Sequence, residues 1–477
     1  MANIDHQSVV GSNDSGIILR PNVRNQGHLE HISSPFTPTK LAWGQEGRCT
    51  IPFQEPGGTH GVIDDLYMTF RIGLDTAGAT LTQLVAINVF ACIESISIEN
   101  EGTKLFEIAG RGAVAAVMAE ESLAMAQHLS NECFVDHWSW YPSATNTSFL
   151  MTGDATHEPT LLNVCLPLNR LTNGMFKNFR CSRLTGITVV VKLVGQPGNS
   201  ANIKETLLFV RNGAGTAAAT QDPALTWCMQ GLALRAEKTV YESDVHLQPL
   251  SNPVRYLSHG YSVIPIAVDL SLATAQTIQL SLGHNFGAFE NLQRLLIWWS
   301  DLGQTTAAPQ VYNGADGRMV RYLQQFWLTD AAVYAAGKSD GLTGYRVFRN
   351  NKLILDGTGT DQRMINWARS CHRRHGVQRV SDCHQNVFIN SPTTIDLCPC
   401  AGHTMPGKSA DSHVLSGHKN DKSGEYLVEI YLAAGTGVTG QFGGVLWCAL
   451  EYQTCIEIEN NNQPASEQRP IITRLVN

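Results

Sequence analysis

Alternation of apolar and polar side chains gives the clearest structural signal in the chain. Between residues 66 and 74 apolar side chains occupy every second position, with polar or small residues between them. This period of two predicts a strand with one buried face. Two β-branched runs, 187–194 and 426–432, predict further strands, and glycines lie beside or just beyond both. Strands therefore dominate the predicted structure.

Only two segments have a helical pattern. Residues 113–129 are rich in alanine and acidic in the middle. Residues 362–374 carry apolar side chains at helical spacing, with Asp361 as an N-cap and Gly376 just beyond the end. Many strands, two helices and abundant glycine-rich turns are typical of β-sandwiches, not of an alternating βαβ fold.

The two halves of the chain repeat each other. Three short segments of the first half recur in the same order in the second: 47–53 as 260–266, 90–98 as 289–297, and 225–228 as 445–448. A predicted helix lies between the second and third landmarks each time. The shared order predicts a tandem repeat. The expected fold is therefore all-β, with two sandwiches of roughly 200 residues, each large enough to bury its own core.

The boundaries of the two units are expected where the strand pattern stops. Pro249 and Pro253 interrupt it between the halves, and both ends of the chain are polar and irregular. We divide the chain into an N-terminal arm, a first sandwich, a second sandwich and a C-terminal arm, at residues 1–35, 36–245, 246–459 and 460–477.

Composition narrows the class of protein further. Hydrophobic residues make up 43% of the 477 positions and charged residues 16%, against about 25% in typical soluble proteins. This balance excludes a disordered chain and a coiled coil. A low charge favours extensive burial against other copies of the chain. A net charge of −7 gives no global reason to bind nucleic acid through phosphates.

The start of the chain and its cysteines bear on the cellular location of the protein. The first residues lack the basic and apolar parts of a signal peptide, so secretion by that route is not expected. The twelve cysteines are therefore expected to be reduced, buried thiols rather than disulfides. The most apolar stretch, 105–129, is interrupted by charges and is not expected to cross a bilayer.

Two glycine-rich motifs match nucleotide-binding patterns. Residues 402–409 fit the phosphate-loop pattern, with Lys408 as the phosphate ligand, but the flanking residues predict neither the preceding strand nor the following helix. Residues 435–440 fit the dinucleotide pattern, yet a strand follows where a helix is needed. We interpret the first as a loop, with a nucleotide site at Lys408 as the alternative, and the second as a glycine-rich hairpin.

A third region is dense in potential metal ligands. Four cysteines and six histidines lie between Cys371 and His418, but no C-x2-C pair occurs among them. Buried thiols and surface histidines are the preferred interpretation, and a zinc module is the alternative. We therefore predict no metal site and no cofactor.

The sequence contains no convincing set of catalytic residues. Residues 337–341 match the nucleophile-elbow pattern G-x-S-x-G, but a strand-like segment follows where a helix is needed. No zinc-protease motif occurs, and adjacent acids such as Asp64 and Asp65 cannot flank one substrate. We predict no catalytic residues and no enzyme.

Two surface features remain as candidate binding sites. A basic segment, set against a plain solvated helix face, is a candidate interface for phosphates or for acidic patches of a neighbour. Its residues are Arg363, Arg369, Arg373, Arg374 and Arg379. Tryptophans at Trp138, Trp140, Trp298 and Trp299 are candidates for stacking on sugars, although packing is the preferred interpretation.

The tandem sandwiches, each with its helix, resemble the double jelly-roll major capsid proteins of the tectivirus–adenovirus lineage. The run 93–102 resembles a strand and turn of that family, and 260–266 is similar to the opening of a second roll. The resemblance implies eight strands in each sandwich and a homotrimer whose six sandwiches form a pseudo-hexagonal capsomer. It covers most of residues 40–458. The N-terminus lacks the amphipathic helix that some relatives lay against a membrane.

The resulting expectation is a major capsid protein of an icosahedral double-stranded DNA virus, located in the virion capsid and assembled in the host cytoplasm or nucleus. Expected partners are two further copies, neighbouring capsomers, and minor capsid or penton proteins. An internal membrane is a further candidate, and sequence-specific nucleic acid is not expected. The alternative is a two-sandwich carbohydrate-binding protein or glycan-active enzyme.

Overall fold

A computed structural model of the chain describes the strands and the connections closest to them. The described residues are 23–32, 40–41, 44–52, 61–74, 82–86, 89–124, 150–153, 162–172, 174–177, 179–180, 184–194, 208–212, 227–241, 254–269, 274–287, 292–300, 342–358, 393–397, 425–432, 443–460 and 470–475.

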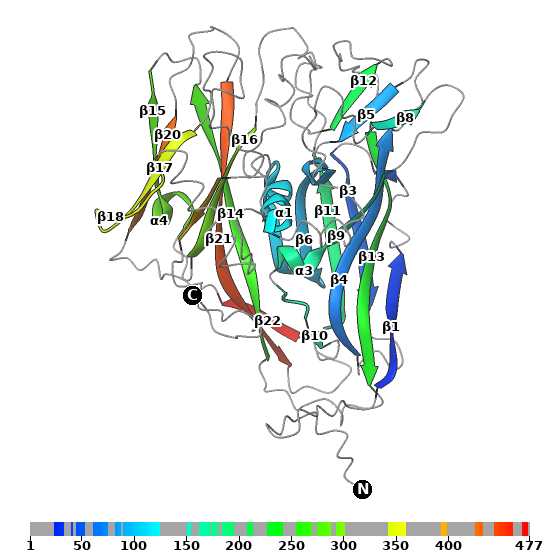
Figure 1. The fold of residues 1–477 in the computed structure, drawn as a ribbon. Helices are drawn as coiled ribbons and strands as arrows, with labels where there is room; N and C mark the ends of the chain where they lie inside the picture. The colour runs from blue at the N-terminus through cyan, green and yellow to red at the C-terminus, as the bar shows by residue number, and fades with distance from the viewer. Residues whose placement is uncertain are drawn as a thin grey trace, which may run out of the picture.

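Two antiparallel sheets form the first sandwich (Figure 1). One consists of β1 (Val23–Ile32), β2 (Lys40–Leu41), β4 (Gly61–Leu74), β9 (Leu162–Pro167), β10 (Phe179–Arg180) and β13 (Trp227–Tyr241). The other consists of β3 (Glu46–Pro52), β6 (Ile93–Asn100), β7 (Thr103–Ala109) and β11 (Gly186–Leu193). A small sheet lies at one end and consists of β5 (Thr82–Ala86), β8 (Leu150–Gly153) and β12 (Leu208–Asn212).

The second sandwich repeats the plan. One sheet consists of β14 (Val254–Asp269), β16 (Leu292–Ser300), β19 (Thr393–Asp396) and β21 (Gly443–Asn460), with β22 (Pro470–Leu475) beside β21. The other consists of β15 (Gln276–Ser281), β17 (Leu342–Arg349), β18 (Lys352–Asp356) and β20 (Tyr426–Leu432).

Strand order identifies both sandwiches as eight-stranded jelly rolls. In the second, the strand orders are β14–β21–β16–β19 and β15–β20–β17–β18. When the eight strands are numbered along the chain, the first sheet has the order one, eight, three, six. The second sheet has the order two, seven, four, five. The first sandwich has the same order if β1 and β2 count as strand one and β9 and β10 as strand six. The predicted all-β fold with two tandem jelly rolls is confirmed.

Two of the three landmark pairs behind that prediction were wrong. Residues 47–53 lie largely in β3, the second strand of its roll, whereas 260–266 lie in β14, a first strand. Residues 90–98 lead into β6, a fourth strand, but 289–297 lead into β16, a third strand. Only the pair at Trp227 and Trp447 marks the same strand, the eighth. Short alternating runs fit any strand of a sandwich, so they indicate a repeat but not which strands correspond.

Helices are few among the described residues. They are the 3-10 turn η2 (Val89–Cys92) and the helices α1 (Ala113–Ala124), α3 (Leu168–Leu171) and α4 (Leu282–Asn285). The predicted helix at 113–129 is thus confirmed as far as Ala124. The one predicted at 362–374 lies outside the described residues. No helix in the described part of the chain is long and apolar enough to span a membrane.

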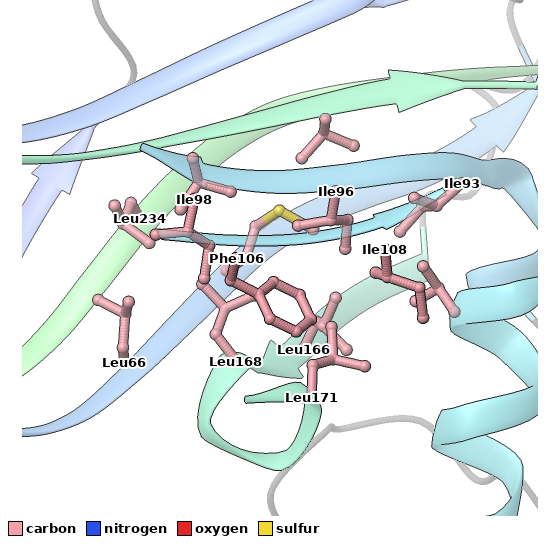
Figure 2. Packing of buried hydrophobic residues seen from close by; sticks show 14 of the residues in the cluster. Leu66, Ile93, Ile96, Ile98, Phe106, Ile108, Leu166, Leu168, Leu171 and Leu234 are labelled. Atoms are coloured by element: carbon pink, nitrogen blue, oxygen red, sulfur yellow. The ribbon is translucent and has the colours of Figure 1, made fainter. Parts of the chain in front are cut away.

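Burial of one face of each sheet builds the core of the first sandwich. In β4, Leu66, Met68, Phe70 and Ile72 are buried, as the alternation predicted. The other sheet contributes side chains of β6, β7 and β11 from the opposite side. Figure 2 shows Phe106 of β7 among leucines of β9 and α3, beneath the isoleucines of β6.

Each predicted arm contributes one strand to its sandwich. From the N-terminal arm, β1 pairs antiparallel with β13, and from the C-terminal arm, β22 pairs with the end of β21. All described strand pairs up to β13 lie within the first sandwich, and all from β14 onward lie within the second. The four-part division of the chain stays a prediction at its individual boundaries.

Candidate functional site

The two sandwiches meet along one broad contact, which we call the seam. It joins β7, the turn after β7, α1, α3 and β10 of the first sandwich to β14, β16 and β21 of the second. Helix α1 lies between the sandwiches (Figure 1). The buried cluster of the first sandwich continues across the seam into the second.

Two tyrosines of β14 anchor one side of the seam. The ring of Tyr261 meets that of Phe106 edge to face, with 6.0 Å between the centroids. Its hydroxyl donates a hydrogen bond of 3.3 Å to the carbonyl of Leu171, at the end of α3. Tyr256 packs on Phe179 with 4.5 Å between the rings, and its hydroxyl accepts the backbone N–H of Arg180. Each ring thus fills apolar space while its hydroxyl finds a partner in the first sandwich.

Two tryptophans form the middle of the seam. The indoles of Trp298 and Trp447 stack nearly parallel, with 6.5 Å between centroids. The indole N–H of Trp298 donates to the carbonyl of Arg111, 3.1 Å away. Gly110 approaches so closely that a Cβ there would stand 2.7 Å from Val263, and its φ of +144° also requires glycine. Because Gly110 has no side chain, the two sandwiches can come into close contact at this turn.

A row of ionisable side chains crosses the face of the second sandwich that lies in the seam. Arg294 and Glu451 lie directly opposite each other on β16 and β21, and Arg294 Nε donates to Oε2 of Glu451. Nδ1 of His259 on β14 lies 2.5 Å from the other carboxylate oxygen. Asp396 of β19 lies opposite Arg294 in the strand pairing, on the side of β16 away from β21. These residues share the face of the two tryptophans, because side chains an even number of positions apart in a strand point to the same side.

Three side chains of this row are buried, which makes the loss of any one of them costly for stability. Arg294 and Glu451 are fully buried, and His259 is 8% exposed. A buried pair of charges is weak evidence for stability, but removing one partner leaves the other uncompensated. All of these side chains belong to one sheet of the second sandwich, so the row stabilises the face of that sheet that lies in the seam. The hydrogen bonds of Tyr261, Tyr256 and Trp298 to the first sandwich fix the relative position of the two bodies, and we interpret the seam as a rigid coupling between them.

The row has little capacity for catalysis or metal binding. Both oxygens of Glu451 are engaged by Arg294 and His259 and are shielded from solvent. Within the described ranges, no group of three His, Cys, Asp or Glu side chains is arranged to hold a metal.

The described cysteines behave as the sequence predicted. Six of them, Cys49, Cys92, Cys165, Cys228, Cys448 and Cys455, are free and buried thiols. Burial raises the pKa of the Cys49 thiol to about 12, and it raises the pKa values of Cys92 and Cys448 as well. A thiol with a raised pKa is a poor nucleophile and a poor metal ligand at neutral pH.

Most candidate sites from the sequence lie outside the described residues. These are the five arginines from Arg363 to Arg379, Lys408 with its loop, the Cys371–His418 region, the 337–341 motif, and Trp138 with Trp140. Trp298 and Trp299 lie in β16, but the side chain of Trp299 is outside what the structure describes. Trp298 is 1% exposed and stacked in the seam, so it cannot stack on a sugar.

The flanks of two glycine motifs are described. Residue 342 begins β17, so a strand follows the 337–341 motif where a nucleophile elbow would need a helix. The 435–440 motif connects β20 to β21, which belong to different sheets. The predicted hairpin is therefore wrong, because the segment crosses from one sheet to the other. Alternating strands on both sides could not distinguish a hairpin from a crossover.

Sequence reasoning missed the seam itself. One signal was present: residues 295–299 are continuously apolar, as in a strand buried on both faces. Arg294, directly before that run, is buried as well, and a buried charge needs a partner. The partner is 157 residues away in the chain, and no local pattern connects the two.

Comparison with known proteins places the fold. No protein-family model matches the chain, and no curated protein matches it in sequence. A chain in the structure of the Sputnik virophage matches with a TM-score of 0.53 and 10% identity, over 98% of this chain and 93% of that one.

Two further solved structures are similar at lower scores. The Faustovirus major capsid protein has a TM-score of 0.49 and 10% identity, over 94% of this chain and 92% of its own. The mavirus major capsid protein has a TM-score of 0.46 and 10% identity, over 99% and 94%. The strand order and the Sputnik match agree, and the chain has the fold of the double jelly-roll capsid proteins.

Proposed function

We propose that the chain is the major capsid protein of an icosahedral double-stranded DNA virus. One observation carries this proposal: the whole chain shares its fold with a chain of a virophage particle, at a TM-score of 0.53. The seam supports it, because a shell subunit must transmit load between its sandwiches without moving them. The protein acts in the virion capsid as a structural subunit, not as an enzyme.

The proposed assembly unit is a homotrimer. Three chains contribute six sandwiches, which stand in a pseudo-hexagonal ring and contact neighbouring capsomers. The two sandwiches of one chain supply part of that arrangement, since they are already joined along the seam. The basic segment from Arg363 to Arg379 is a candidate contact to acidic patches of a neighbour or to phosphates. Minor capsid proteins and an internal membrane are further proposed partners.

Sedimentation of the purified chain tests the proposal. We expect a species with three times the 52.1 kDa of one chain, and hexagonal arrays or shells by electron microscopy at higher concentration. A chain that stays monomeric at all concentrations would contradict it. The carbohydrate-binding alternative has lost Trp298, which is buried, and no described feature favours it.

A further inference from the structure

The two jelly rolls contain the same hairpin. In the first, β6 and β7 are joined by Glu101 and Gly102, with φ of 47° and 83°. In the second, β17 and β18 are joined by Asn350 and Asn351, with φ of 51° and 60°. Both are two-residue turns with positive φ at both positions, which is the type I′ geometry.

The two hairpins also share a bulge. On β7, Leu105 stands between two register pairs, Glu99 with Lys104 and Ile98 with Phe106. On β18, Ile354 stands between the pairs Phe348 with Leu353 and Val347 with Leu355. Leu105 and Ile354 are therefore equivalent positions, each the third residue after its turn. Bulges are conserved features of a fold, so the coincidence indicates that the hairpins correspond.

The two hairpins differ in the exposure of their apolar side chains. Leu105 is 1% exposed, whereas Ile354 is 46% exposed and its neighbour Leu353 is 44% exposed. These are the exposed large hydrophobic side chains of the described residues. The first hairpin lies in the seam, where β7 packs against β14 and Phe106 meets the ring of Tyr261. No described strand lies beyond β18, which is the edge of its sheet.

We propose that β18 docks on the first sandwich of a second copy of this chain, along β2, as β7 docks on β14 within one chain. The proposal rests on the proposed capsid function. The seam defines the surface, because β14 is the first strand of its roll and β2 belongs to the first strand of the other. On β2, Leu41 points into the core and Lys40 is exposed, so the outer side of β2 is accessible. An exposed apolar edge strand needs such a cover.

This contact is head to tail. The donor surface is on the second sandwich and the acceptor surface is on the first, so every copy that docks leaves another pair of surfaces to be used. Such heterologous contacts form a ring when the rotation closes and a filament when it does not. Six sandwiches from three chains close the ring if the contact between chains repeats the geometry of the seam.

A two-fold contact between two β18 strands is the competing arrangement. Antiparallel pairing of β18 with itself centres on Ile354 and places Lys352 opposite Asp356 of the other copy. Asp356 is already engaged within its own chain, by the N–H and hydroxyl of Thr358 and by Arg346. This competes with pairing to a lysine. The two arrangements predict different cross-links.

Sedimentation of full-length variants gives the first test. Ile354→Asp should weaken self-association by about tenfold or more, because a charge would replace the apolar centre of the contact. Leu353→Asp should act in the same direction. Lys352→Gln is the matched control, since it alters an exposed polar residue of the same strand, and it should change the association less than about twofold. An unchanged melting temperature of the separated monomers shows that the effect is on association.

Cysteine cross-linking gives the second test. Chains carrying Ile354→Cys are mixed with chains carrying Lys40→Cys and treated with a flexible bismaleimide. We expect cross-linked dimers in the mixture beyond those of the parent chain, and none with either variant alone. Dimers from Ile354→Cys alone indicate the two-fold contact and overturn the proposal. Absence of cross-links in a mixture of exchanging trimers also overturns it.

The outcomes separate this inference from the function. A trimer that survives Ile354→Asp and Leu353→Asp overturns the role of β18 and leaves the capsid proposal standing. A wild-type chain that never associates overturns both.

Discussion

Strands β4 and β16 occupy the same place in the two jelly rolls and are buried differently. In β4, Leu66, Met68, Phe70 and Ile72 are buried, while Arg71 between them is exposed. In β16, every residue from 292 to 298 is buried. One face of β16 contacts the core of its own roll and the other lies in the seam.

The difference shows that one fold can present two kinds of outer face. The outer face of β4 is polar and half-buried to exposed, with Tyr67 and Thr69 beside Arg71. The outer face of β16 carries Trp298, Leu296 and the buried Arg294. An arginine on the outer face of strand three is therefore a surface residue in one roll and part of a buried charged row in the other. The role of the arginine is decided by whether the other sandwich covers the outer face of its strand. Its position in the jelly roll does not decide this role.

The largest expected effect compares these two arginines. Arg294→Ala leaves Glu451 buried beside His259 with no arginine, and it should lower the free energy of unfolding by about 3–5 kcal/mol. Arg71→Ala is the matched control and should change it by less than about 0.5 kcal/mol. Urea denaturation followed by tryptophan fluorescence measures both. Equal losses would break the comparison.

A smaller effect is expected at the tryptophan of the seam. Trp298→Phe removes the hydrogen bond to Arg111 and part of the stacking area on Trp447, so it should cost about 2 kcal/mol. The substitution keeps an aromatic ring and should leave strand content by circular dichroism unchanged. No loss of stability would mean that the seam adds little to the folded state.

A single hydroxyl provides a finer test. Tyr261→Phe keeps the ring contact with Phe106 and removes the hydrogen bond to Leu171, so it should cost about 1 kcal/mol. Tyr67→Phe on the outer face of β4 removes a hydroxyl that is bonded to Asp65 and half-buried. It should cost less than Tyr261→Phe. The reverse order would contradict the seam as the more shielded surface.

The smallest effect at neutral pH concerns Cys49, in the core of the first roll. Its pKa is raised by burial from 9.0 to about 12, so above pH 9 the unfolded thiol loses its proton while the folded one keeps it. The thiol's contribution to stability is therefore complete below pH 9 and falls as pH rises from 9 to 12. Iodoacetamide at pH 8 should label Cys49 only after unfolding, as mass spectrometry would detect. Rapid labelling of the native chain would contradict its burial.

Sequence patterns correctly predicted several strands and one helix of the structure. Alternation identified β4, β11 and β20 and the buried side of β4, because a period of two reports directly which side chains face a core. Alanine-rich residues identified α1. The repeat was also visible, yet the correct strand correspondence was not. The hairpin pair, with Glu101–Gly102 in one roll and Asn350–Asn351 in the other, shares geometry without sharing residues.

By itself, then, the sequence determined an all-β chain with two sandwiches, because burial of alternate side chains is a local property. Only the tertiary structure decided that Arg294, Glu451 and His259 meet, that Trp298 is shut inside the seam, and that Ile354 stands exposed where Leu105 is covered. The first outcome depends on which strands pair within the second sandwich, and the other two depend on which faces the two sandwiches bring together. Contacts between residues some 150 positions apart leave no periodic trace along the chain.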